Sequence, residues 1–271
     1  MELSLQYRAA RARLRAWLSD HPHMLDAFRV TRCLLLQGPW QPWLIRRYRA
    51  RAENPPLAVN DRTLFPEVDV GAAVGSLRRD AYAPGFCVPS ALVDEIAAYA
   101  RAVGGKRIDR PEDACSAVRT LAHDPAIVDV ARGYLQAEPV FLKSQIYWTV
   151  PAGNAVGNAM AAAEGGRFHY DIPDIQALTV FVYLTDVDAE CGPHVVIRGT
   201  QRRRTPREIL ARFITDEDAE RRWGDRIETI TGPRGTAWFE DITCYHKQAP
   251  AAKVRGMIYL IYALHRSREA A

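Results

Sequence analysis

The stretch QALTVFVYLTD, residues 176–186, decides the fold that the sequence predicts. β-branched and aromatic residues fill it without glycine or proline, which is typical of a strand inside a sheet. Similar stretches follow one another through the second half of the chain, at residues 139–151, 193–199, 226–232, 235–241 and 253–264. A helical insert at residues 206–223 interrupts them. We therefore expect a mostly antiparallel unit of about eight strands.

The first half has the apolar spacing of helices instead. Ser90 is placed to cap a helix that Gly104 and Gly105 end, and Asp124 is placed to cap another. Helical spacing also occurs at residues 3–18, 24–36 and 43–52. Together the halves predict an α+β fold: a helical N-terminal extension, residues 1–60, packed on a double-stranded β-helix, the jelly-roll or cupin-like barrel, over residues 61–271.

Composition narrows the class of protein. The chain is 48% hydrophobic and 25% charged, as ordinary soluble proteins are. No apolar run approaches the roughly 20 residues of a membrane span, and early charges leave no room for a signal peptide. The 5 cysteines are scattered without a CxxC pair. We expect a cytoplasmic protein without a disulfide framework and without nucleic-acid binding.

Charge is uneven along the chain. Residues 1–53 contain ten arginines and four acidic residues, a net +6, whereas the whole chain is +4. This basic segment is either a solvated helical face or a weak contact with an anionic membrane surface or an acidic partner. The sequence leaves the oligomeric state open.

The motif RFHYDIPD, residues 167–174, offers a histidine and an aspartate two positions apart. With 7 histidines and 32 acidic residues, about 0.8 such pairs would arise by chance. In an extended segment His169 and Asp171 project to the same side, so both can bind one metal ion. Non-haem iron sites add a second histidine and leave the opposite face open. His246, between two strand-like stretches, is the best candidate, with His194 the first alternative.

Arg255 stands among apolar residues of the last strand, on the same face as Lys253, Met257 and Tyr259. A buried arginine is costly unless it is paired. Its partner is either the carboxylate of a dicarboxylate co-substrate or a carboxylate of the protein itself. In residues 139–151 a second alternation puts Phe141, Lys143, Gln145, Tyr147 and Thr149 on one side.

These motifs, in this order, resemble the phytanoyl-CoA dioxygenase family of iron(II)/2-oxoglutarate-dependent oxygenases. The resemblance rests on the H-x-D pair, on the block CGPHVVIRGTQ of residues 191–201, and on the distal histidine followed by arginine. It covers about residues 80–265. Arg198 replaces the usual proline of the block, and Gln201 the usual histidine.

The resemblance implies His169, Asp171 and His246 as iron ligands and Arg255 as the partner of the distal carboxylate of 2-oxoglutarate. Tyr183 stands where the family has a further co-substrate contact, and the strand with Lys143, Gln145 and Tyr147 helps to hold co-substrate and substrate. For these four residues ordinary barrel-lining polarity is the alternative.

The implied activity is oxygenation of a small molecule with O2, releasing succinate and CO2. Related halogenases carry a small residue in place of the carboxylate, so Asp171 favours hydroxylation; desaturation, ring closure and epimerisation use the same site. Rival classes are a cupin-like binding barrel without turnover and a metal-dependent isomerase or hydrolase. The substrate itself cannot be predicted.

A glycine- and alanine-rich segment, residues 151–166, precedes the H-x-D motif. Glycines make such a segment costly to order. We expect it either to close over bound substrate as a lid or to be a passive connection. If it is passive, closure would fall to the basic stretch at residues 202–204 or to the helical half.

Overall fold

The computed structural model describes residues 31, 34–151, 166–201, 205–210 and 213–264. The predicted lid and the basic stretch at residues 202–204 therefore lie almost wholly outside the described residues, as do the helices expected before residue 31. The boundary expected at residue 60 stays a prediction.

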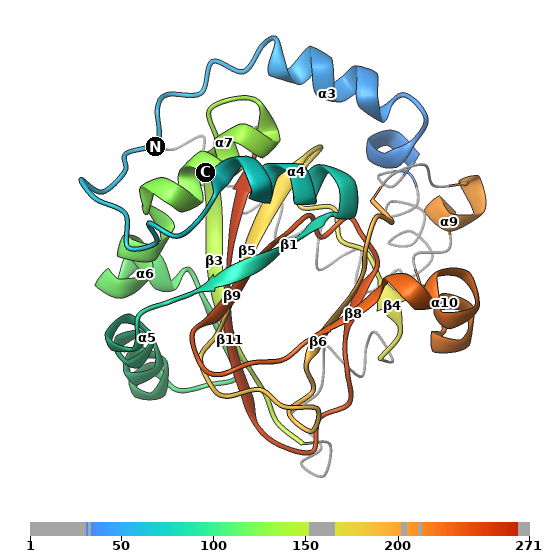
Figure 1. Ribbon diagram of the computed structural model, residues 1–271. Helices are drawn as coiled ribbons and strands as arrows, with labels where there is room; N and C mark the ends of the chain where they lie inside the picture. The colour runs from blue at the N-terminus through green and yellow to red at the C-terminus, as the bar shows by residue number, and fades with distance from the viewer. Residues whose placement is uncertain (1–30, 32–33, 152–165, 202–204, 211–212, 265–271) are drawn as a thin grey trace, which may run out of the picture.

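Eleven strands in the described part form two facing sheets (Figure 1). The larger sheet has the order β1-β9-β5-β11-β3-β2 and the smaller has the order β7-β4-β10-β6-β8. The larger sheet comprises β1 (Tyr82–Cys87), β2 (Arg107–Asp109), β3 (Val140–Thr149), β5 (Ala177–Tyr183), β9 (Thr236–Glu240) and β11 (Arg255–Ala263). The smaller comprises β4 (Phe168–His169), β6 (His194–Ile197), β7 (Phe213–Ile214), β8 (Ile227–Ile230) and β10 (His246–Gln248). All their pairings are antiparallel, as expected of a jelly-roll.

Helices cover the outer face of the larger sheet (Figure 1). Asp124 caps α7, as predicted, by accepting a hydrogen bond from the Ala126 amide at 2.9 Å. Ser90 does not cap α5, because the helix begins at Ser90 itself and Pro89 is the capping residue; Gly104, with φ of 72°, ends it as expected. This layer comprises α4 (Val70–Asp80), α5 (Ser90–Val103), α6 (Ser116–Ala122) and α7 (Pro125–Leu135), with α3 (Gln41–Arg49) outside it.

Two further predictions about elements are wrong. The single helix expected at residues 206–223 is two, α9 (Pro206–Leu210) and α10 (Asp216–Trp223), with β7 between them. Thr215 is extended and its hydroxyl accepts from the Asp218 amide at 3.2 Å, so α10 starts afresh there. Phe141 does not share a face with Lys143, because a bulge in β3 shifts the register and turns Phe141 onto Tyr262 in the helix-facing core.

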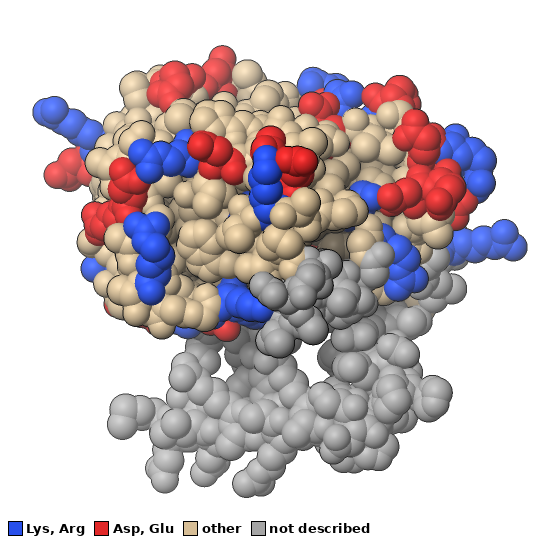
Figure 2. Space-filling model, turned by 90° about the horizontal axis from the view of Figure 1, so that it is seen from below, with Lys and Arg blue, Asp and Glu red and all other residues tan. Residues whose placement is uncertain are grey.

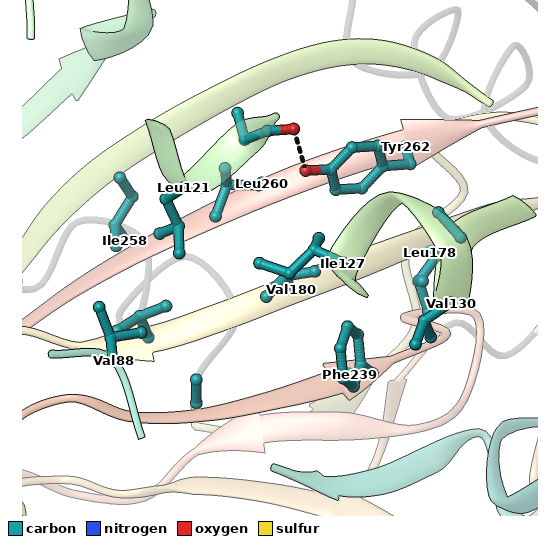
Figure 3. Close-up of a cluster of buried hydrophobic side chains, with 14 of the residues drawn as sticks. Val88, Leu121, Ile127, Val130, Leu178, Val180, Phe239, Ile258, Leu260 and Tyr262 are labelled. Atoms are coloured by element: carbon teal, nitrogen blue, oxygen red, sulfur yellow. Dashed lines mark hydrogen bonds between the residues drawn. The ribbon is translucent and has the colours of Figure 1, made fainter. Parts of the chain in front are cut away.

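The two faces of the larger sheet have separate roles. Its outer face forms the main core with α4–α7, where Leu121 and Ile127 pack on Leu260 and Val180 (Figure 3). In this core the Tyr262 hydroxyl donates to the Ala122 carbonyl at 2.7 Å, which fastens β11 to α6. Its inner face carries Arg255, Met257, Tyr259 and Ile261 toward the smaller sheet.

On the described surface seen from below, acidic and basic side chains lie next to one another between areas of uncharged residues (Figure 2). Lys253 at the start of the β11 segment, for example, pairs with Asp188 at 2.9 Å and Glu190 at 2.6 Å. Within the described residues, none of the helices is both long and apolar enough to cross a bilayer.

Candidate active site

The H-x-D pair and the distal histidine meet between the sheets. His169 ends β4 and lies directly opposite His246, the first residue of β10, and their ring centroids are 4.6 Å apart. Asp171 follows β4, where its amide donates to the Ile242 carbonyl at 2.8 Å. One ligand atom from each of the three residues lies within 4.8 Å of the others. The structure therefore brings together two imidazoles and one carboxylate from segments 75 positions apart in the sequence.

Hydrogen bonds select which imidazole nitrogen faces the centre. Nδ1 of His169 is 3.2 Å from the Arg167 carbonyl, and Nδ1 of His246 is 3.0 Å from the Cys244 carbonyl. A carbonyl only accepts, so in the neutral form of each ring Nδ1 carries the proton and Nε2 keeps its lone pair. Burial, reinforced by the neighbouring His169, lowers the pKa of His246 to about 4. His246 is therefore neutral at neutral pH, as a metal ligand must be.

A buried carboxylate, that of Glu240, lies next to both His194 and His246. Glu240 Oε2 lies 2.9 Å from His194 Nε2 and accepts from Trp238 Nε1 at 3.0 Å. Burial opposes its ionisation, yet the contacts with His194, His246 and Trp238 together outweigh burial and hold the pKa of Glu240 below its ordinary value. The His194 ring in turn stacks on His246, with centroids 5.4 Å apart and planes 18° apart.

Glu240 and Cys244 also form a second possible metal group with His246. This group would use Nδ1 of His246, 3.8 Å from Glu240 Oε1. That nitrogen already faces the Cys244 carbonyl. The group with His169 and Asp171 is the better candidate, because its histidines present unprotonated Nε2 atoms and Asp171 is partly exposed.

Arg255 is completely buried, with 0% of its surface exposed. Its guanidinium donates to Gln248 Oε1 at 2.8 Å, to Thr149 Oγ1 at 3.3 Å and to the Gly192 carbonyl. All three acceptors are neutral, and Nε has no hydrogen-bond partner. No ion pair to Arg255 occurs among the residues that the structure describes. The guanidinium is thus held inside the barrel without a described protein carboxylate to balance its charge.

The other predicted residues spread along the inner face. Tyr147 lies beside Arg255, whose guanidinium carbon is 5.7 Å from its ring centroid. Lys143 lies near the Tyr259 ring, at 5.7 Å. Six residues of strand separate Lys143 from Thr149, roughly 20 Å, so Lys143 and Arg255 lie toward opposite ends of the barrel.

The side chains of Gln145 and Tyr183 each donate one hydrogen bond and accept another within the protein. The Gln145 amide donates to Asp109, and its oxygen accepts from the Tyr259 hydroxyl at 2.7 Å. The Tyr183 hydroxyl donates to the Ile230 carbonyl at 2.8 Å and accepts from the His194 amide at 3.0 Å. Burial raises the pKa of Tyr183. Tyr183 thus ties β5 to the smaller sheet.

Sequence reasoning missed two neighbours of Arg255 and the support of His246. Gln248 lies two residues after His246, so the period of a strand already placed both on one face. Thr149 belongs to the predicted alternation but was given no role. Glu240 is an acidic residue within a buried apolar strand, a signal of a paired carboxylate.

Comparison with known proteins confirms the fold. No protein-family model matches the sequence, and no curated protein matches it. Solved structures do match. The epimerase SnoN from nogalamycin biosynthesis is 19% identical, with a TM-score of 0.55 over 71% of this chain and 82% of that chain. EctD from S. alaskensis is 18% identical, with a TM-score of 0.53 over 77% and 81%. AviO1 from Streptomyces viridochromogenes Tue57 is 15% identical, with a TM-score of 0.51 over 72% and 95%. The predicted jelly-roll core is thus shared with these proteins.

Proposed function

We propose that this protein is an iron(II)- and 2-oxoglutarate-dependent oxygenase that acts on a small molecule. The observation that carries the proposal is the pairing of two features inside one barrel: the His169, Asp171 and His246 group, and the buried Arg255 without a described carboxylate partner. Two imidazoles and one carboxylate with open positions suit non-haem iron(II). An uncompensated guanidinium suits the distal carboxylate of a dicarboxylate.

The similar solved structures support the same cofactors. SnoN is described as a non-haem α-ketoglutarate-dependent epimerase and was solved in complex with Fe3+, α-ketoglutarate and nogalamycin RO. EctD was solved with bound Fe. We extend iron and 2-oxoglutarate to this chain because its own donor set fits them. Membership of the phytanoyl-CoA dioxygenase family remains part of the proposal.

In the proposed mechanism, iron held by this site would supply the activation of O2, coupled to the oxidative decarboxylation of 2-oxoglutarate to succinate and CO2. His169 and His246 would hold the metal through Nε2, and Asp171 would supply the anionic ligand. Arg255, with Tyr147 beside it, would receive the distal carboxylate and so orient the co-substrate. Thr149 and Gln248 already fix the guanidinium and would keep it aimed there.

Lys143 and Gln145, toward the other end of β3, would contribute to the substrate side rather than to the Arg255 subsite. Tyr183 would act through the position of His194, since its hydroxyl is bonded to backbone groups. The aromatic rings of Trp238 and Tyr259 pack against Phe181 on the inner face of the larger sheet and would help to exclude water from the site.

Hydroxylation is the proposed outcome, because Asp171 occupies the ligand position that a halide would need. Epimerisation is the second candidate, favoured by the fold shared with SnoN. A binding barrel without turnover is the alternative from another class, and it gives no role to Arg255.

The proposal is tested first by binding and then by turnover. Calorimetry should detect 2-oxoglutarate binding to protein loaded with cobalt(II), a redox-inactive stand-in under anaerobic conditions. Succinate formation with iron(II) and O2 should then be measured across a panel of small molecules, with His246→Ala as the control. Metal binding without any affinity for 2-oxoglutarate would point to the rival isomerase, hydrolase or cupin-like binding protein.

A further inference from the structure

Helix α3 presents an unusual outer face. Its inner residues Leu44 and Ile45 are partly buried against the main core. Its outer face exposes 43% of Trp40 and 53% of Trp43, and Leu35 just before the helix is 57% exposed. The other large exposed apolar side chains among the described residues are Tyr48, also on α3, and Val59, Leu64, Val103 and Val254. This concentration of aromatic surface therefore needs a partner.

The same face is basic. Arg46 and Arg47 are exposed on the last turn, and Arg51 follows just beyond it. The Arg47 guanidinium lies 5.6 Å from the Trp43 ring centroid. Residues 31–52 contain no acidic residue at all, in contrast to the surface in Figure 2, where acidic and basic side chains lie next to one another.

Inward contacts fix α3 at one end of the barrel. Arg49 turns inward, donating to Gln176 Oε1 at 3.0 Å and to Gln136. Gln176 immediately precedes β5, and the Asn54 amide donates to the Leu264 carbonyl at 2.9 Å, just past β11. In Figure 1, α3 is the outermost helix at this end of the molecule. Arg255 begins β11 at the opposite end, so α3 lies on the side away from the Arg255 subsite.

The inner wall of the barrel at the α3 end combines an apolar cluster with Lys143, which lies opposite Ile261 across β3 and β11. Ala177, Ile261 and Ala263 form a small cluster there, with Leu142 against it. A lipid-borne molecule that enters from this end would meet the aromatic and basic face of α3 first and this apolar cluster next.

We propose that α3 docks the protein onto an anionic lipid bilayer. Tryptophan rings settle at the level of the headgroups, and arginines beside them attract anionic lipid. A second copy of the chain fits this face less well, because a twofold contact places the same basic face on both sides, and residues 31–52 offer no acidic side chain to pair with it. Docking would turn the α3 end of the barrel toward the bilayer. Resting on the proposed function, this orientation identifies the substrate as an amphipathic molecule that partitions into membranes.

The test uses the full chain and vesicles of phosphatidylcholine with or without phosphatidylglycerol. We expect sedimentation with the anionic vesicles only, and release by salt. The double variant Arg46→Gln/Arg47→Gln should bind about 30-fold more weakly, since each basic residue near an anionic surface contributes a factor of about five. The control Arg101→Gln/Lys106→Gln removes the same charge from exposed positions at the end of α5 and just beyond it, and should bind like the parent protein.

A second double variant, Trp40→Ser/Trp43→Ser, should also lose binding while circular dichroism stays unchanged. No sedimentation of the parent protein, or equal binding by all variants, would overturn the proposal. Dimerisation in solution that the α3 variants abolish would assign the face to a protein contact instead. The 2-oxoglutarate affinity of these variants is measured in parallel. It should be unchanged, so failure of membrane binding and failure of the proposed activity are told apart.

Discussion

Replacing Arg255 by methionine separates a co-substrate anchor from a structural residue. Methionine keeps most of the volume, so the change removes charge and hydrogen bonds without opening a large cavity. In the present structure the guanidinium has neutral acceptors only, and its Nε has no partner. Removing a buried charge that lacks a counterion relieves a desolvation cost, which offsets the loss of those hydrogen bonds. The free energy of unfolding should change by less than about 1 kcal/mol.

Binding should respond in the opposite way. A hydrogen bond to a charged group contributes about 1.5–3 kcal/mol, and a guanidinium can offer two to one carboxylate. Losing about 3 kcal/mol corresponds to a Kd for 2-oxoglutarate that is roughly 150-fold higher. The affinity is measured by calorimetry on cobalt(II)-loaded protein, and the stability by urea unfolding.

Lys253→Met is the matched control. It removes the same charge two residues away, from an exposed pair with Asp188 and Glu190, and should leave the affinity for 2-oxoglutarate unchanged. The reasoning is refuted if Arg255→Met keeps the parent affinity while stability falls by about 3–5 kcal/mol, the cost of breaking a buried ion pair.

Two further predictions concern the metal ligands. His169→Ala, Asp171→Ala and His246→Ala should each fold but lose metal and turnover, as measured by bound iron and succinate release; full activity of His246→Ala would make His194 the next ligand to test. In the metal-free protein, the pKa of about 4 for His246 lies below the ordinary value of 6.5, so stability is present above about pH 6.5 and falls as the pH drops toward 4. Urea unfolding should show that the free energy of unfolding falls by about 2 kcal/mol between about pH 7 and about pH 5. In His246→Ala this pH dependence should be weaker. A free energy of unfolding that does not change with pH in the parent protein would contradict the buried neutral imidazole.

Capping residues and glycines in the sequence predicted the helices whose ends depend on local contacts. The cap at Asp124 and the glycine stop at Gly104 set α7 and α5 close to their observed bounds. Helix α4 was missed because two glycines obscure its pattern, although Asp69 caps it through the Ala72 amide at 2.9 Å. Strand β1 was missed because proline and glycine interrupt it. A Cβ on Gly85 would fall 1.0 Å from the Ala237 carbonyl oxygen, so only the partner strand explains that glycine.

The candidate site likewise has one part that sequence patterns predict and another part that they do not. The two-residue period placed His169 and Asp171 on one side and singled out Arg255 from its apolar neighbours. The surroundings of Arg255 depend on register between strands far apart in sequence, which no local pattern contains. Thr149 pairs with Arg255 across β3 and β11, and Gln248 reaches it from the other sheet. The bulge that removes Phe141 from the inner face is likewise visible only in the pairing.

The smaller sheet joins His169 and His246 through very short strands. β4 has two residues and β10 three, so few ladder hydrogen bonds hold this pair together. A cation shared by the two rings would act as a cross-link between neighbouring strands, at the point where the backbone supplies least. Folding of this sheet and metal loading would then be thermodynamically linked: free metal would raise the stability of β4 and β10, and any variant that loosens their pairing would lower metal affinity from a distance. Removal of the metal by a chelator would therefore lower the stability of the smaller sheet, whereas the larger sheet, which packs against the helices, would keep its stability.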